Sequence, residues 1–126
     1  MTQVSVRYIV NNVEEAIPFY VEHLGFKLDF HPGGFAVLSR GDLRLMLNQP
    51  GIGGAGRPDI AGRTPAPGGW NRFQIVVERL DEVFARLRQA RVPLRTDIVT
   101  GMGSRQILVE DPSGNLIEIL EVSPAP

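Results

Sequence analysis

The residues that could carry chemistry in this chain are arginines, amides and one carboxylate, placed at alternate positions of four predicted strands. Side chains at alternate positions of a strand point to the same face. The polar face so defined contains Ser5, Arg7, Arg44, Met46, Asn48, Arg72, Gln74 and Glu118. Three guanidinium groups therefore accompany one carboxylate. Because one arginine side chain can bind two oxygens of a carboxylate or phosphate at once, this face predicts a site for an anionic or oxygen-rich small molecule.

Other roles for the same residues remain open. Arg7, Arg72 and Glu118 could instead neutralise one another, since an isolated buried charge is costly. Trp70, the only tryptophan, precedes the strand of Arg72 and is either a stacking surface for a planar ligand or a packing anchor. Glu118 is the candidate general base if the protein is an enzyme, although nearby arginines oppose the proton uptake that this role requires.

Neither histidine is a strong candidate ligand. His23 lies near the end of a predicted helix, where an imidazolium interacts favourably with the carbonyl dipoles. His31 precedes Pro32 and is predicted to be an exposed turn residue, because no second imidazole or carboxylate follows at ligand spacing. The chain has no cysteine, which excludes disulfides and thiolate ligands. We therefore expect no metal and no cofactor.

The elements that position these residues occur twice, each time as a strand, a helix and three strands. The first copy is predicted at 4–10, 13–24, 27–31, 35–39 and 43–48, and the second at 72–77, 80–90, 94–99, 105–110 and 116–121. Such a duplicated unit must bury its apolar faces against its copy. The pattern predicts an α+β fold, in which two tandem βαβββ modules form a curved mixed sheet, a half-barrel, around a cavity.

The two predicted helices differ in how they begin and end. Asn12 and Glu15 resemble a capping box at the start of the first helix, and Gly25 supplies a left-handed stop. Its predicted buried stripe consists of Val13, Ile17, Tyr20, Val21 and Leu24. The second helix has Arg91 where the first has its glycine, so its stop lacks the usual residue.

We predict a single domain over 1–126, with modules at about 1–48 and 70–126. The connector at 49–69 contains seven glycines and four prolines, which argues against regular structure. A segment of this length inside a small domain is either a passive linker or a tether that partly covers the pocket.

Composition limits the classes of binding partner that we expect for this protein. The formal net charge is −1, with charges of both signs mixed along the chain, so nucleic acid is an unexpected partner. The first ten residues lack the apolar core of an export signal, and no stretch has the roughly 18 consecutive apolar residues of a membrane span. A soluble cytoplasmic protein is expected.

Three motifs resemble those of a known family. They are 13–20 (VEEAIPFY) with 24–26 (LGF) near the start, and 110–118 (EDPSGNLIE) near the end. Together with the paired modules, they resemble the vicinal oxygen chelate superfamily of glyoxalases, dioxygenases and bleomycin-resistance proteins. The resemblance implies metal ligands at the positions of Ser5, Met46, Arg72 and Glu118. Only Glu118 is a suitable ligand type, because arginine repels a cation and methionine suits hard metals poorly.

The resemblance implies a small-molecule-binding homodimer of the glyoxalase and bleomycin-resistance type, and because three of the four ligand positions carry unsuitable residues, we expect this protein to be metal-independent. Bleomycin itself fits a basic lining poorly, because a cationic ligand calls for an acidic cleft. An alternative is a lyase, isomerase, glyoxalase-like or dioxygenase-like enzyme that uses Glu118 with a non-standard or absent metal site. A third possible class is a pure interaction module, whose cavity would be filled by side chains.

Overall fold

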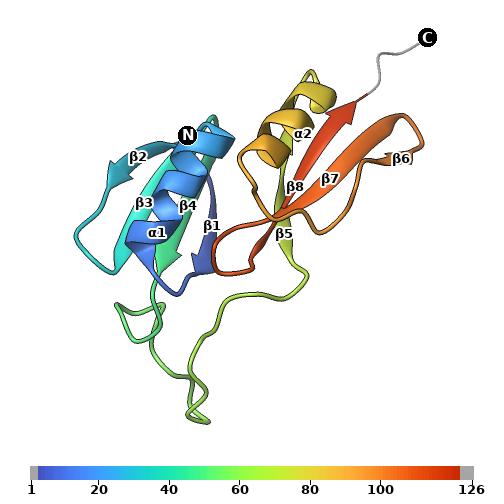
Figure 1. Ribbon diagram of the computed structural model, residues 1–126. Coiled ribbons are helices and arrows are strands. Elements are labelled where there is room, and N and C mark those ends of the chain that lie inside the picture. Colours follow the sequence, from blue (N-terminus) through green and yellow to red (C-terminus); the bar gives the residue numbers. More distant parts are fainter. Residues whose placement is uncertain (1–2, 123–126) are drawn as a thin grey trace. The chain divides into compact units, whose positions relative to one another are not determined.

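The structure of the chain, a computed structural model, describes residues 3–122. The ends of the predicted domain, residues 1–2 and 123–126, lie outside the described residues. The chain forms two compact units (Figure 1). Within the described residues, the first comprises 3–68 and the turn Pro112–Asn115, and the second comprises Gly69–Asp111 and 116–122.

The first unit is a βαβββ module. Its elements are β1 (Val4–Ile9), α1 (Val13–Pro18), η1 (Phe19–His23), β2 (Lys27–Phe30), β3 (Phe35–Arg40) and β4 (Leu43–Asn48). The strands form one sheet in the order β1-β4-β3-β2, in which β1 is parallel to β4 and the other pairs are antiparallel. The helix packs against this sheet, as Figure 1 shows.

The second unit repeats this topology. Its elements are β5 (Arg72–Val76), α2 (Leu80–Gln89), β6 (Val99–Gly101), β7 (Ser104–Glu110) and β8 (Leu116–Val122). The order is β5-β8-β7-β6, with β5 parallel to β8 and the other pairs antiparallel. The predicted α+β class with tandem βαβββ modules is therefore confirmed.

The first helix begins as predicted and then departs from regular α geometry. The Asn12 side chain accepts a hydrogen bond from the Glu15 N–H at 2.8 Å, and Gly25 ends the helical segment with a φ of 73°. Pro18 lies inside the helix, and a π-helical turn follows it. Proline lacks an N–H and disturbs the preceding turn, and the wider π-turn then rotates the helix faces. Val21, predicted to be buried, is consequently exposed.

The second helix ends in a left-handed residue although no glycine is present, because Arg91 itself has a φ of 60°. Its start is also unusual. Arg79 provides no side-chain cap, and the Leu80 N–H instead donates to Glu121 Oε1 of β8 at 2.9 Å. A carboxylate from a distant strand thus replaces the local cap.

The predicted strand at 94–99 is wrong. Only Leu94 forms a β-bridge, to Val109, and the strand begins at Val99. The backbone N–H groups of Arg95 and Thr96 both donate to the Leu108 carbonyl, at 2.8 and 3.4 Å. Two successive donors that share one acceptor cannot continue a regular ladder, in which alternate residues bond to the neighbouring strand.

Each unit has its own core, built from alternate strand residues and the inner face of its helix. In the first unit the core includes Val13, Ala16, Tyr20, Ala36, Leu38, Leu45 and Leu47, and in the second Leu80, Leu87, Ile107, Val109, Ile117 and Ile119. On β1 only Tyr8 of the strand residues is buried, and Val4, which shares the strand face of Tyr8 by alternation, is exposed. Among the described residues, no helix has the length and apolar character needed to cross a membrane.

Candidate functional site

A cavity of about 480 Å³ opens in the first unit. It lies beside the strand residues that alternate with the buried core residues. Three strands, the β2–β3 turn and the connector after β4 supply its lining, which consists of Arg7, Pro32, Gly33, Phe35, Met46, Asn48, Ile52, Gly53, Gly54 and Ala55. Three of the residues predicted from strand alternation, Arg7, Met46 and Asn48, are therefore brought together here.

Arg7 is the only charged residue in this lining. Its Nη1 donates to Asn48 Oδ1 at 2.5 Å, and its Nη2 lies 3.5 Å from Met46 Sδ. Within residues 3–122, no carboxylate forms an ion pair with it. Because a guanidinium has five N–H donors, these two contacts leave donors for a ligand.

Asn48 connects this guanidinium to the connector. The residue is 2% exposed, and its side chain accepts from Arg7 and donates from Nδ2 to the Ile52 carbonyl at 3.3 Å. The strand register places Asn48 opposite Ile9 on one side and Phe35 on the other. Both functional groups of this amide are thus used, so Asn48 positions Arg7 and Ile52.

The beginning of the connector forms a compact loop. The Gly51 N–H donates to the Gly56 carbonyl at 2.6 Å, and the Gly56 N–H donates to the Ile52 carbonyl at 3.2 Å. Gly56 is buried, and a Cβ there would lie 2.5 Å from the Ile52 carbonyl oxygen. Any larger residue would displace the loop, so glycine is required for residues 52–55 to form one wall of the cavity.

The other predicted residue pair of this unit lies outside the cavity lining. Arg44 Nε donates to Ser5 Oγ at 2.9 Å, between neighbouring residues of the parallel β1–β4 pair. Neither side chain belongs to the lining. Strand parity correctly placed these residues on a common face, but it could not say how far along the strands the cavity extends.

In the second unit, Arg72, Gln74 and Glu118 form a closed polar cluster. Arg72 donates to Glu118 Oε1 from Nε at 3.1 Å and from Nη2 at 3.0 Å, while Gln74 Nε2 donates to Oε2. Glu118 is 9% exposed. Because both carboxylate oxygens accept hydrogen bonds, Arg72 and Glu118 neutralise one another as in the second interpretation of these residues, but Arg7 takes no part in this cluster.

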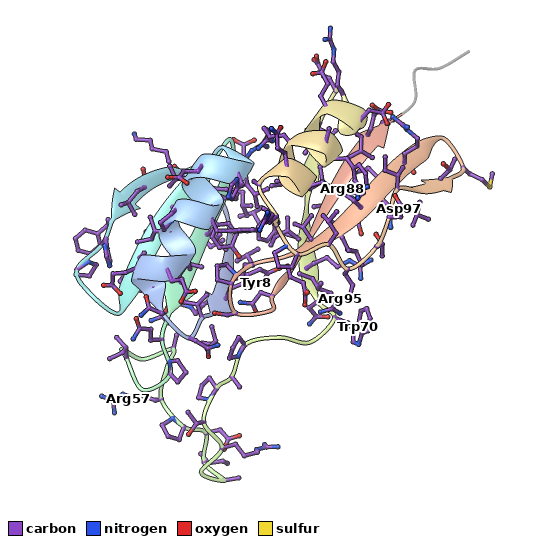
Figure 2. The ribbon with its side chains drawn as sticks, in the orientation of Figure 1. Tyr8, Arg57, Trp70, Arg88, Arg95 and Asp97 are labelled. Atoms are coloured by element: carbon purple, nitrogen blue, oxygen red, sulfur yellow. The ribbon has the colours of Figure 1, made fainter. Side chains whose placement is uncertain are left out.

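Trp70 is not a packing anchor, because 67% of the residue is exposed. The Arg95 guanidinium lies over its ring, 5.1 Å from the centroid. Figure 2 labels both side chains. Arg95 also pairs with Glu110 at 2.6 Å. The exposed ring therefore takes part in a cation–π contact on the surface of the second unit.

Sequence reasoning missed the contacts that two residues of the first unit make. Asn115 is 4% exposed, donates to the Ile9 carbonyl at 2.8 Å and accepts from the Gly68 N–H at 2.9 Å. The motif that contains Asn115 predicted a turn, but it did not predict these hydrogen bonds to Ile9 and Gly68. His31 is also less exposed than predicted, and its Nε2 lies 3.2 Å from Glu14 Oε1, so a carboxylate distant in sequence is close in space.

The residues at the implied metal positions do not fit a divalent ion. Ser5 Oγ already accepts from Arg44, Arg72 is a cation, and both oxygens of Glu118 are hydrogen-bonded. Among residues 3–122, no group of three or more histidine, cysteine, aspartate or glutamate side chains is arranged to hold a metal.

Comparisons with known proteins give one family. Residues 2–119 match the model of the Glyoxalase/Bleomycin resistance protein/Dioxygenase superfamily. A bleomycin resistance protein of Geobacillus stearothermophilus is 28% identical over 119 residues, which cover 89% of this chain and 90% of that protein.

Solved structures agree in fold. A lactoylglutathione lyase from Agrobacterium tumefaciens matches with a TM-score of 0.76 and 21% identity, covering 95% of this chain and 92% of that one. A superfamily member from Sphaerobacter thermophilus has a TM-score of 0.76 and 24% identity, covering 96% and 97%. With the paired βαβββ modules, these matches confirm the resemblance, and the chain belongs to the Glyoxalase/Bleomycin resistance protein/Dioxygenase superfamily.

Proposed function

We propose that this protein is a metal-independent small-molecule-binding protein of the glyoxalase and bleomycin-resistance type. Its ligands are anionic or oxygen-rich, and they bind in the cavity beside Arg7. The observation that carries this proposal is a cavity of about 480 Å³ whose one charged lining residue has no carboxylate partner within residues 3–122. Ligand pockets in proteins usually measure about 300 to 1,000 Å³.

The charge of Arg7 supports an anionic ligand. A guanidinium is permanently protonated and offers a planar fork of donors that matches two oxygens of a carboxylate. Asn48 holds this fork from a nearly buried position, so little side-chain freedom is lost on binding. The same charge disfavours a cationic ligand such as bleomycin, although a curated relative is named a bleomycin resistance protein.

The donor set supports metal independence. Arg72 and Gln74 occupy both oxygens of Glu118, the one suitable ligand at the implied metal positions. These contacts also weigh against the enzyme alternative, since both oxygens of the candidate general base already accept hydrogen bonds. We extend the proposal to a cytoplasmic protein that forms a homodimer. Light scattering on the purified protein would test the homodimer.

Thermal unfolding with added ligands tests the proposal. Protein purified without chelator is subjected to elemental analysis, then heated with divalent ions, phosphate and small organic acids. A ligand selective for the folded state raises the melting temperature by mass action, so we expect anions to do so and divalent ions not to. Arg7→Gln should abolish the anion effect, while Arg44→Gln, the matched control outside the cavity, should retain it. Stoichiometric bound metal, or a shift produced by divalent ions alone, would overturn the proposal.

A further inference from the structure

We infer that the cavity beside Arg7 selects aromatic monocarboxylates, with the carboxylate on Arg7 and the ring between Phe35 and Ile52. The inference rests on the proposed function above and narrows it to one class of ligand.

The polar part of the lining has capacity for a single anionic group. Arg7 is its only charged residue and Asn48 its only amide. The Asn48 oxygen accepts from Arg7, and its nitrogen donates to the Ile52 carbonyl. A phosphate ester or a sugar would need several further side-chain donors and acceptors, which this lining does not supply. One guanidinium fork matches one carboxylate.

The remaining side chains are apolar and present an aromatic surface. Pro32, Phe35, Met46, Ile52 and Ala55 complete the lining together with three glycines. The Phe35 ring packs edge-to-face on Phe30, with centroids 6.4 Å apart and an angle of 75° between the planes. This contact orients the ring. Aromatic side chains favour aromatic partners beyond the area that they bury, and a methionine sulfur adds a favourable contact.

The strand register sets the separation between the charge and the apolar surface. Arg7 lies opposite Met46 on the β1–β4 pair, and Asn48 lies opposite Phe35 on the β4–β3 pair. Arg7 and Phe35 are therefore two strands apart and offset by two residues along β4, which is roughly 12 Å between their backbones. A carboxylate at the guanidinium consequently directs an attached ring toward Phe35.

Ile52 is the large apolar side chain that the connector adds to the lining. The residue is 40% exposed, and a Cβ at Gly34 would come within 3.0 Å of its side chain. The loop bonds around Gly56 and the bond from Asn48 hold it in place. An exposed isoleucine held in place within the same lining as an aromatic ring provides a surface for a flat apolar ligand.

Calorimetric titration with matched ligands tests the inference. The series is 1-naphthoate, benzoate, cyclohexanecarboxylate, acetate and benzamide at one ionic strength. We expect 1-naphthoate to bind more tightly than acetate or benzamide by about tenfold or more, and benzoate more tightly than cyclohexanecarboxylate by roughly threefold. Phe35→Leu should remove the preference for benzoate over cyclohexanecarboxylate.

Three further variants identify the site and guard against misfolding. Ile52→Ala changes an exposed loop side chain and should weaken 1-naphthoate binding while leaving acetate binding unchanged. Arg7→Gln should weaken all the carboxylates and spare benzamide, and Arg44→Gln should change nothing. If acetate and benzoate bind equally well and both depend on Arg7, the inference is overturned and the proposed function still stands. If no anion binds in an Arg7-dependent way, both are wrong.

Discussion

The guanidinium of Arg72 contacts one oxygen of Glu118 through two nitrogens, Nε at 3.1 Å and Nη2 at 3.0 Å. These residues lie on the paired parallel strands β5 and β8, and Gln74 engages the other oxygen. The family resemblance implies metal ligands at both positions. An ion pair thus stands at two of these positions, where the arginine supplies the positive charge that balances the carboxylate.

Removal of Arg72 should therefore destabilise the protein. Arg72→Met leaves the Glu118 carboxylate nearly buried without a cation, and we expect a loss of about 2 to 4 kcal/mol in the free energy of unfolding. Glu118→Gln should cost less, because the Arg72 side chain is 30% exposed and reaches water. Urea unfolding measures both. The double variant Arg72→Met with Glu118→Leu should be less destabilised than the sum of the single changes, and additive effects would show that the pair is uncoupled.

Glu121 should make part of the stability dependent on acid pH. The Leu80 backbone N–H, and then the Arg105 side chain, hold the pKa of Glu121 below its ordinary value of 4.5. A carboxylate whose pKa is lowered by folding stabilises the protein above its unfolded pKa, and this contribution is lost as the pH falls through the folded pKa. Glu121→Gln should thus be less stable than the original chain near pH 7, and the difference should shrink below pH 4.5.

Urea midpoints measured from about pH 7 to pH 3 test this expectation, since acid titration spans that range. Glu78→Gln is the matched control, because Glu78 is exposed and forms no ion pair with the other described residues. Its curve should run parallel to that of the original chain. A parallel curve for Glu121→Gln as well would contradict the assignment.

The two helix ends predict opposite effects of glycine. Arg91 has a φ of 60°, a left-handed conformation that costs a residue with a Cβ about 1 to 2 kcal/mol. Arg91→Gly should relieve this cost, and after the added flexibility of the unfolded chain we expect a net gain of about 0.5 kcal/mol. Gly25→Ala should cost about 1 kcal/mol. Its Cβ would lie an ordinary 3.7 Å from Arg40 Nε, so backbone conformation and not crowding is the cause. Denaturant midpoints of both variants test the two expectations. A protein destabilised by Arg91→Gly would contradict the expected relief of backbone strain.

Local pattern predicted most of the architecture. Alternation of apolar residues placed β1, β3, β4, β5, β7 and β8 close to their observed bounds, because one face of each strand must be buried. The stripe of the first helix was less accurate at Val21, since a simple 3.6-residue period takes no account of the π-turn after Pro18. The segment 94–99 looked like a strand because it is apolar at intervals, but its hydrogen bonds to β7 are irregular.

The sequence by itself determined the βαβββ plan, its repetition and the polar face of its strands, since these follow from the period of the pattern and from local caps and turns. Only the tertiary structure decided which arginine is neutralised: Arg72 meets Glu118, while Arg7 meets an amide in a cavity. Such pairings depend on the register between strands distant in sequence and on the path of the chain after β4. Neither the period of a strand nor its composition carries that information.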